Sequence, residues 1–225
     1  ARGDIGREHQ SRRNPPGQVS TQHKDRDWAA YYIKTGSRPP RETLMFALDR
    51  FDAEPTDAAR FAVDLGAGSG RDVIEMLRRG WRVLAIDAEP DAIDALNARP
   101  DLPPEADLSG NIARFENATW PECDLVNSSF ALPLCAPKDF EDVWRQIVSS
   151  LRPGGRFAGQ LYGERDSWVG RDGMTFHSRT QVEALLADFD VEYFVEEEDD
   201  STTPRGEAKH WHVFHIVARR LVANA

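Results

Sequence analysis

One stretch constrains this chain more than any other: an apolar run that carries Asp64 and passes directly into three glycines. Residues 63–70 read Val-Asp-Leu-Gly-Ala-Gly-Ser-Gly, and Asp87 ends the next apolar run, 17 residues after Gly70. Such a run is typical of a buried strand that enters a tight turn and a helix. Glycine adopts positive φ easily and lets the backbone pass close to a ligand. The pattern therefore predicts a strand–turn–helix–strand unit around a nucleoside-bearing molecule.

The glycine spacing separates this loop from the common phosphate-binding loops. The chain has G-x-G-x-G, whereas a dinucleotide-binding loop has G-x-G-x-x-G and would place glycine where Arg71 stands. No Lys-Ser/Thr pair follows the loop, which excludes a P-loop. Asp64, two residues before the first glycine, belongs to neither motif. A carboxylate at this position suits a ligand end that carries an ammonium group.

Three motifs, in this order, resemble those of the class I S-adenosylmethionine-dependent methyltransferases. Residues 64–70 match the first motif, residues 83–87 match the second strand with its terminal carboxylate, and residues 151–157 match the turn into the fifth strand. The resemblance covers residues 25–220. Locally, the run Gly-Arg-Asp at residues 70–72 and the run Gly-Trp-Arg-Val at residues 80–83 are most similar to small-molecule methyltransferases of the tellurite-resistance type.

The resemblance implies a cofactor, S-adenosyl-L-methionine, and a set of residues that hold it. In that family the carboxylate after the second strand, here Asp87, holds the ribose hydroxyls, and an acidic or amide residue after the third strand contacts adenine. Asp87 as a helix cap and Glu116 as a surface carboxylate remain open alternatives. The expected cofactor residues are Asp64, Gly66, Ala67, Gly68, Gly70, Asp87, Ala88, Glu116, Asn117, Asn127 and Ser128.

The acceptor side is predicted from aromatic residues and one histidine. In such folds the substrate cover comes from the N-terminal helix and from the loop after the fifth strand, which is long here and therefore favours a functional role. His177 is the candidate base, because histidine titrates near neutral pH; a capping or packing role is the alternative. The expected catalytic residues are His177 and Tyr162, and the expected substrate-binding residues are Trp28, Tyr31, Tyr32 and Trp168.

Strand and helix patterns alternate along the chain, which predicts an α/β fold. We expect a Rossmann-like, doubly wound, mostly parallel seven-stranded sheet with a C-terminal antiparallel strand pair. Residues 1–24 are expected to be a disordered tail and residues 25–225 a single domain. The acidic run 196–200 is expected to be a solvated strand end and loop. Strands are predicted at 61–65, 81–86, 112–115, 123–127, 156–161, 191–196 and 211–217, and helices at 28–33, 41–51, 71–79, 90–97, 139–151 and 180–187.

Composition narrows the partners. The 225 residues carry a net charge of −10, which disfavours a general nucleic-acid footprint. The two cysteines show no metal spacing. His210 and His212 share one face of a predicted strand, whereas His215 lies on the other face, where a packing role is expected, so no metal is expected. The sequence shows no membrane-spanning run and no signal-peptide core, so we expect no membrane partner and a cytoplasmic enzyme. Its partner is expected to be a small-molecule methyl acceptor, and its state a monomer or homodimer.

The function predicted from these observations is methyl transfer from S-adenosylmethionine to an oxygen, nitrogen or sulfur atom of a small molecule. The main alternative is a protein that binds the cofactor without turnover, as a sensor or degenerate subunit. A nicotinamide-dependent oxidoreductase is disfavoured by Arg71 in place of glycine. A nucleic-acid aminomethyltransferase is disfavoured by residues 127–130, which read Asn-Ser-Ser-Phe where that group carries Asn-Pro-Pro-Tyr.

Overall fold

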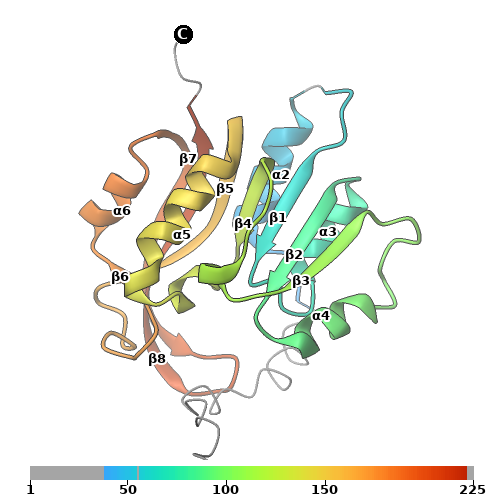
Figure 1. Cartoon of the computed structure of the whole chain (residues 1–225). Helices are drawn as coiled ribbons and strands as arrows, with labels where there is room; N and C mark the ends of the chain where they lie inside the picture. Colours follow the sequence, from blue (N-terminus) through green and yellow to red (C-terminus); the bar gives the residue numbers. More distant parts are fainter. Residues whose placement is uncertain (1–37, 55, 222–225) are drawn as a thin grey trace, which may run out of the picture.

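The computed structural model describes residues 38–54 and 56–221. They form a sheet with helices on both of its faces (Figure 1). The helices are α2 (Glu42–Asp52), α3 (Arg71–Arg78), α4 (Pro90–Asn97), α5 (Pro137–Ser150) and α6 (Arg179–Leu185), with short 3-10 turns η1 (Phe115–Asn117) and η2 (Leu132–Leu134). The strands are β1 (Phe61–Leu65), β2 (Arg82–Asp87), β3 (Leu108–Ile112), β4 (Cys123–Ser128), β5 (Leu151–Gly163), β6 (Phe176–His177), β7 (Phe189–Thr202) and β8 (Ala208–Arg220).

The sheet has the strand order β3-β2-β1-β4-β5-β8-β7, with the short β6 paired to β5. The first five strands of this order run parallel, whereas β8 lies antiparallel to β5 and to β7. This confirms the predicted Rossmann-like, mostly parallel sheet with its C-terminal antiparallel pair. The order reverses between β1 and β4, and in open sheets of this kind ligands bind beyond the carboxyl ends of the strands at that point.

Two cores hold the helices on opposite faces of the sheet. Helices α2, α3 and α4 pack on one face over small and branched strand residues such as Ala62 and Val83. Helices α5 and α6 pack on the other face, where Trp144 meets Phe157 of β5 at 5.0 Å between ring centroids. The inner strands are buried on both faces, which is why they read as continuous apolar runs in the sequence.

The third strand lies earlier than predicted: it spans Leu108–Ile112, and the prediction of residues 112–115 is wrong. This edge strand is largely exposed and contains serine, glycine and asparagine, so it lacks the apolar alternation that marks a strand. Phe115, which suggested the later position, instead packs against the core from η1.

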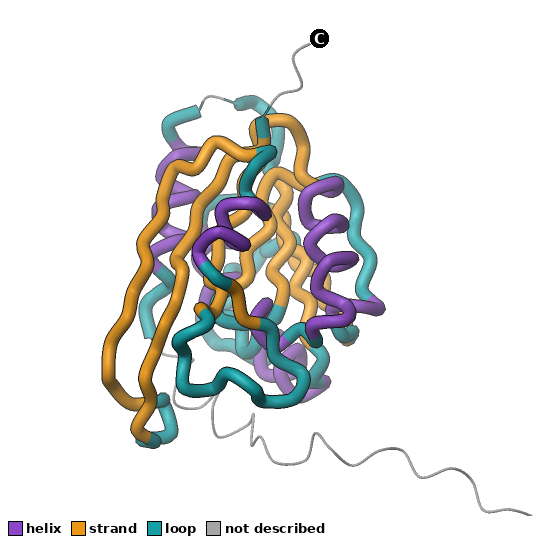
Figure 2. The backbone as a smooth tube through the Cα atoms, turned by 90° about the vertical axis from the view of Figure 1, so that its left-hand side faces the viewer, coloured by secondary structure: helices purple, strands orange, loops and turns teal. Residues whose placement is uncertain are grey.

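The acidic run 196–200 is not a strand end followed by a loop, as predicted, but lies inside β7. Strands β7 and β8 pair from Phe189–Arg220 to Thr202–Ala208 and form a long hairpin. Its tip extends past Tyr162, near the carboxyl end of β5 (Figure 2). The carboxylates are stabilised there by basic side chains of the facing strand, for example Glu196 by His212 at 2.9 Å.

The predicted tail 1–24 and the predicted helix 28–33 lie outside the described residues, so the predicted domain boundaries stay predictions. Within the described residues, no helix is long and apolar enough to cross a membrane.

Candidate functional site

The glycine turn, residues 66–70, connects β1 to α3 at the carboxyl edge of the sheet and packs against the loop after β4 and against α4. Gly66, Gly68 and Gly70 all have positive φ, from +53° to +83°. A Cβ on Gly66 would lie 2.2 Å from Cβ of Ala131, and one on Gly70 would lie 2.1 Å from Cδ1 of Leu96. Two of the three predicted glycines are therefore required by close packing against the loop after β4 and against α4.

Asp87 ends β2 beside this turn and is 8 % exposed. Its Oδ2 accepts the N–H of Gly68 at 2.8 Å, and its Oδ1 accepts the N–H of Glu89 at 2.9 Å. Burial raises the pKa of Asp87, and backbone hydrogen bonds, including one from Ala88, oppose the rise. A carboxylate has about four lone-pair sites, so each oxygen keeps capacity for a further donor, such as one of two vicinal hydroxyls.

The side chains of four polar residues meet where β1 and β4 end, and we call them the carboxylate cradle: Asp64, Asp72, Asn127 and Ser129. The Nδ2 of Asn127 donates to Oδ1 of Asp64 at 2.8 Å and to Oδ2 of Asp72 at 3.2 Å. The hydroxyl of Ser129 also donates to Oδ2 of Asp72. Asp64, Asp72 and Asn127 are almost completely buried, with exposures of 2 %, 4 % and 0 %.

The cradle brings two carboxylates together without a cation bonded to either in the described structure. Burial, followed by repulsion from Asp72, raises the pKa of Asp64 well above its ordinary value, and only the amide of Asn127 opposes this rise. The Oδ1 of Asn127 is buried and has no hydrogen-bond partner among the described residues. A buried polar group without a partner is costly. A ligand that brings positive charge and N–H donors would satisfy both requirements.

The remaining predicted cofactor residues differ in how free their side chains are. Asn117 ends η1 and is exposed, and Glu116 accepts a bond from Nε of Arg114 at 2.6 Å. They follow Ala113, whose N–H donates to the carbonyl of Asp87, so both lie just beyond β2. Ser128 is fully buried, and its hydroxyl donates to the carbonyl of Leu65, so that hydroxyl connects two strands.

The predicted acceptor residues Tyr162 and Trp168 lie together in what we call the aromatic cluster. Their ring centroids are 6.2 Å apart, and Tyr162 lies 6.1 to 6.2 Å from the other three rings. Predicted residues Trp28, Tyr31 and Tyr32 lie outside the described residues. The cluster consists of Phe130, Tyr162, Trp168, Phe176 and Trp211.

Phe130 connects the cluster to the cradle, because it follows Ser129 directly. Among the described residues it is the non-glycine residue with positive φ, at 56°. Its N–H donates to Oε1 of Gln160 at 3.1 Å, which holds this unusual conformation. Such strain collects at functional sites. Nothing in the sequence indicates this conformation, because left-handed backbone is expected at glycine or asparagine rather than phenylalanine.

The structure does not bring His177 and Tyr162 together. His177 pairs with Gly163 and packs on Phe140 of α5, at 4.6 Å between ring centroids. Tyr162 points to the opposite face of β5, the face from which Gln160 reaches α2. Burial lowers the pKa of His177 to about 4, and its Nδ1 has no partner among the described residues. Ser178, not His177, caps helix α6.

A different histidine lies on the face of Tyr162. His215 of β8 pairs with Gln160, one residue beyond the level at which β4 ends. Its ring lies 6.0 Å from that of Phe130, and its Nε2 bonds Oε2 of Glu197 at 2.7 Å. Sequence reasoning assigned His215 to packing. The cross-strand partner that orients the ring only becomes visible once the register of β7 and β8 is known.

Sequence reasoning also missed a buried ion pair under the aromatic cluster. The ammonium of Lys209 bonds Asp166, and neither side chain is exposed. Its Nζ lies 4.2 and 4.3 Å from the rings of Trp211 and Trp168, within cation–π range. Burial lowers the pKa of Lys209, and Asp166 opposes that shift. This pair fixes the loop after β5 to the hairpin.

The three histidines of β8 bind carboxylates rather than forming a common site. His210 bonds Asp200 and Glu198, at 2.8 and 3.1 Å, whereas His212 bonds Glu196. In the described part of the chain no group of three or more His, Cys, Asp or Glu side chains could hold a metal ion.

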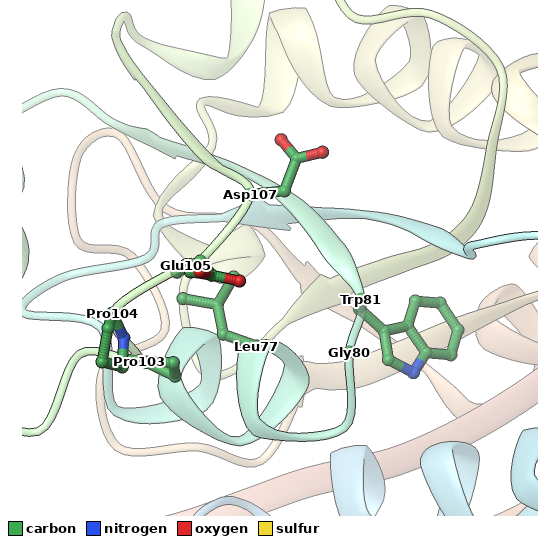
Figure 3. A pocket seen from close by; sticks show the side chains of 8 residues that line it. Leu77, Gly80, Trp81, Pro103, Pro104, Glu105 and Asp107 are labelled. Atoms are coloured by element: carbon green, nitrogen blue, oxygen red, sulfur yellow. The ribbon is translucent and has the colours of Figure 1, made fainter.

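Two surface hollows lie at the opposite, amino edge of the sheet. One, of about 520 Å³, is lined by residues that precede β2 and β3, including Trp81, Pro103 and Asp107 (Figure 3). The other, of about 480 Å³, lies by the amino ends of β1, β4 and β5 and is lined by Arg60 and Arg152 among others. Neither touches the cradle or the aromatic cluster.

The chain is similar in sequence to known methyltransferases. Residues 62–155 match the family model described as a methyltransferase domain. Uncharacterized methyltransferases of Mycobacterium tuberculosis and Mycobacterium bovis are 34 % identical over an alignment of 139 residues, and the match covers 56 % of this chain and 53 % of each relative. The chain therefore spans about half the length of the curated relatives it matches.

Solved structures share the fold. TehB from Haemophilus influenzae superposes with a TM-score of 0.68 at 14 % identity, covering 84 % of this chain and 65 % of that chain. A 1,6-didemethyltoxoflavin-N1-methyltransferase from Burkholderia thailandensis, with bound 1,6-didemethyltoxoflavin and S-adenosylhomocysteine, gives 0.59 at 18 % identity, covering 86 % and 81 %. The family match agrees with the predicted resemblance to methyltransferases over residues 62–155, and these neighbours share the predicted fold.

Proposed function

We propose that the methyltransferase domain of this chain transfers a methyl group from S-adenosylmethionine to an oxygen, nitrogen or sulfur atom of a small molecule. The observation that carries the proposal is the carboxylate cradle, two buried acids around one amide. It lies next to Asp87, which has free acceptor capacity. An ammonium group and a ribose within one ligand match these two positions.

The residues that fit the cofactor lie at or just beyond the carboxyl ends of three neighbouring strands, β4, β1 and β2. Asp64 and Asn127 bind its ammonium end, Asp87 accepts the two ribose hydroxyls, and Glu116 or Asn117 contacts the adenine amino group. The backbone of Ala67, Gly68 and Ala88 borders the nucleoside. When bound, the cofactor supplies an electrophilic methyl group on a positively charged sulfur, so no metal is required.

The acceptor binds on the side of the aromatic cluster that Phe130 connects to the cradle. Tyr162 and Trp168 provide apolar ring surface that excludes water and aligns the nucleophile, which is where most of the rate of an in-line displacement arises. For an acceptor that carries a proton, Nδ1 of His215 receives it while Glu197 holds Nε2. His177 is the less suitable base, since it is buried against α5 with a pKa of about 4.

The same considerations favour a small molecule over a nucleic acid. The chain has a net charge of −10, which repels a phosphate backbone. A cytoplasmic location and a monomeric or homodimeric state remain part of the proposal.

Calorimetric titration with S-adenosylmethionine, S-adenosylhomocysteine and NAD tests the cofactor. We expect micromolar binding of both sulfur nucleosides and no binding of NAD. Binding of NAD alone would indicate an oxidoreductase and refute the proposal.

Turnover is tested by incubating the protein with methyl-labelled S-adenosylmethionine and panels of thiols, amines and phenols. Label transfer to one class is expected, and it identifies the acceptor atom. Tight cofactor binding with no transfer to any panel would favour the alternative, a binding protein without turnover.

A further inference from the structure

Residues 39–43, which precede α2 and begin its first turn, are bonded to the start of α3, to one cradle residue and to β5. We call this segment the α2 leader. The carbonyl of Pro39 accepts a hydrogen bond from Nε of Arg71 at 2.6 Å, and the N–H of Arg41 donates to Oδ1 of Asp72 at 3.0 Å. The two residues that bond the leader, Arg71 as donor and Asp72 as acceptor, follow directly after the last glycine of the turn. The first turn of α3, which directly follows the glycine turn, therefore holds the leader.

The other end of the leader is attached to the acceptor side. Oγ1 of Thr43 accepts a bond from Nε2 of Gln160 at 2.9 Å, and Oε1 of the same Gln160 holds the N–H of Phe130. The guanidinium of Arg41 lies 4.3 Å from the centroid of the Phe130 ring. The leader therefore spans from the cradle to the aromatic cluster.

Asp72 is bonded both to the other cradle residues and to the α2 leader. Its Oδ2 accepts from Asn127 and Ser129 in the cradle, and its Oδ1 accepts from the leader. A first-turn acid that merely stabilised the dipole of α3 would face solvent, but Asp72 is 4 % exposed, and its side chain bonds Arg41, Asn127 and Ser129, which all lie outside α3.

We infer that Asp72 is a positioning residue that couples the ammonium end of the bound cofactor to the seating of the α2 leader over the acceptor side. This inference rests on the proposed function. Asp64 and Asp72 repel each other and share one amide, so a cation between them stabilises the conformation in which Asp72 accepts the Arg41 N–H. A ligand shifts a conformational equilibrium only through such a difference in affinity.

Because of this coupling, two related nucleosides should differ in how far they stabilise the leader. S-adenosylhomocysteine carries the amino-acid end, whereas 5′-methylthioadenosine has the same nucleoside and lacks that end. Only the first can place an ammonium group in the cradle. We therefore expect the first, and not the second, to stabilise the leader when each is saturating.

Hydrogen exchange of the Arg41 amide and its neighbours in the full chain measures this seating. In the unsubstituted protein, saturating S-adenosylhomocysteine should slow exchange about tenfold, the effect of one charge-assisted hydrogen bond. Methylthioadenosine should leave the rate within about twofold of the free protein. In Asp72→Ala, S-adenosylhomocysteine should bind more weakly by calorimetry, because one cradle carboxylate is lost, and at saturation it should no longer slow exchange. Asp91→Ala removes an exposed first-turn acid of α4 and is the matched control, with the full slowing retained.

Asp72→Asn serves if the alanine variant does not fold, because it keeps the shape and an acceptor for Arg41 but removes the charge. It should retain less than half of the slowing. Equal slowing in the Asp72 variants and the unsubstituted protein, or equal slowing by the two nucleosides, would overturn the inference while leaving the proposed function intact. If neither nucleoside binds the unsubstituted protein, the proposed function fails and the inference falls with it.

Discussion

At the amino edge of the sheet the buried guanidinium of Arg156 lies between two carboxylates, whereas at the carboxyl edge two buried carboxylates, Asp64 and Asp72, surround a single amide. Arg156 bonds Glu192 at 2.6 and 2.9 Å and Glu54 at 2.6 Å. Burial lowers the pKa of Arg156, but these two partners raise it by more, so its net pKa is higher than usual. For Asp64 burial and a like charge act in the same direction.

The difference separates a structural role from a binding role. A buried charge that its own chain neutralises is complete without a ligand, and its loss affects folding. A buried charge that repels its neighbour is completed only by something from outside, and its loss affects binding. Arg156 belongs to the first kind and Asp64 to the second. The predictions below test this assignment in order of expected size.

Removal of a partner at the amino edge should have the largest effect on stability. Glu192→Ala leaves the buried Arg156 with Glu54 alone, and we expect the free energy of unfolding in urea to fall by about 3 kcal/mol. Affinity for S-adenosylhomocysteine should not change in the folded protein. Glu192→Gln keeps a hydrogen-bond acceptor and should lose less. A loss of affinity with unchanged stability would reverse the assignment of this edge.

Removal of Asp87 should have the opposite signature. Asp87→Ala removes two charge-assisted hydrogen bonds to the ribose, so the affinity for S-adenosylhomocysteine should fall by about 3 kcal/mol. The unfolding midpoint should fall less than in Glu192→Ala, because the variant leaves no buried charge unpaired and loses only the bonds from the Gly68 and Glu89 amides. Asp94→Ala, an exposed acid of the neighbouring helix, is the control and should bind normally. Unchanged affinity in folded Asp87→Ala would leave only the helix-capping role.

The two histidines beside β5 should differ in turnover. With an acceptor that carries a proton, His215→Gln should lower kcat about 100-fold, because the proton acceptor is lost. His177→Leu should leave kcat nearly unchanged. The reverse result would restore His177 as the base, as the sequence predicts.

His177→Leu should also change acid stability. Since burial lowers the pKa of His177 to about 4, its contribution is present above pH 6.5 and is lost as the pH falls from 6.5 through 4. The variant should lose less stability over this window than the unsubstituted protein.

Asp64 should have the smallest effect on stability. Its contribution should fall as the pH rises, which is opposite in sign to that of His177. Its pKa is raised in the folded state, so its contribution to stability is present below about pH 3.9, the unfolded value, and is lost as the pH rises through the raised value. Affinity for an ammonium-bearing ligand should rise over that same window, because Asp64 ionises. Asp64→Asn should remove both slopes, and slopes that persist in the variant would contradict the role of this carboxylate.

The cofactor side of the site was more predictable from the sequence than the acceptor side. The alternation of strands and helices, the glycine turn and Asp87 were predictable, because they depend on local patterns: apolar runs, positive φ and a carboxylate at a strand end. Asp72 belongs to one of the motifs, but the sequence does not indicate which residues its side chain contacts. Its role depends on β4 and α2, which meet it only in the fold.

The acceptor side was much less predictable. His177 and Tyr162 lie close in sequence, yet the pleat of β5 and β6 directs them to opposite faces. His215 and Glu197 come together only through the register of the β7–β8 hairpin. Phe130 takes a backbone conformation that its residue type does not suggest. Such pairings arise from tertiary contacts, which no local pattern records.

The most direct measurement compares the affinities of S-adenosylhomocysteine and methylthioadenosine by calorimetry, in the unsubstituted protein and in Asp64→Asn. If the cradle binds the ammonium end, the unsubstituted protein should prefer S-adenosylhomocysteine by about 100-fold, and the variant by about tenfold or less. Equal affinity for both nucleosides in the unsubstituted protein, or an undiminished preference in the variant, would contradict the claim that the paired carboxylates are completed by the ligand.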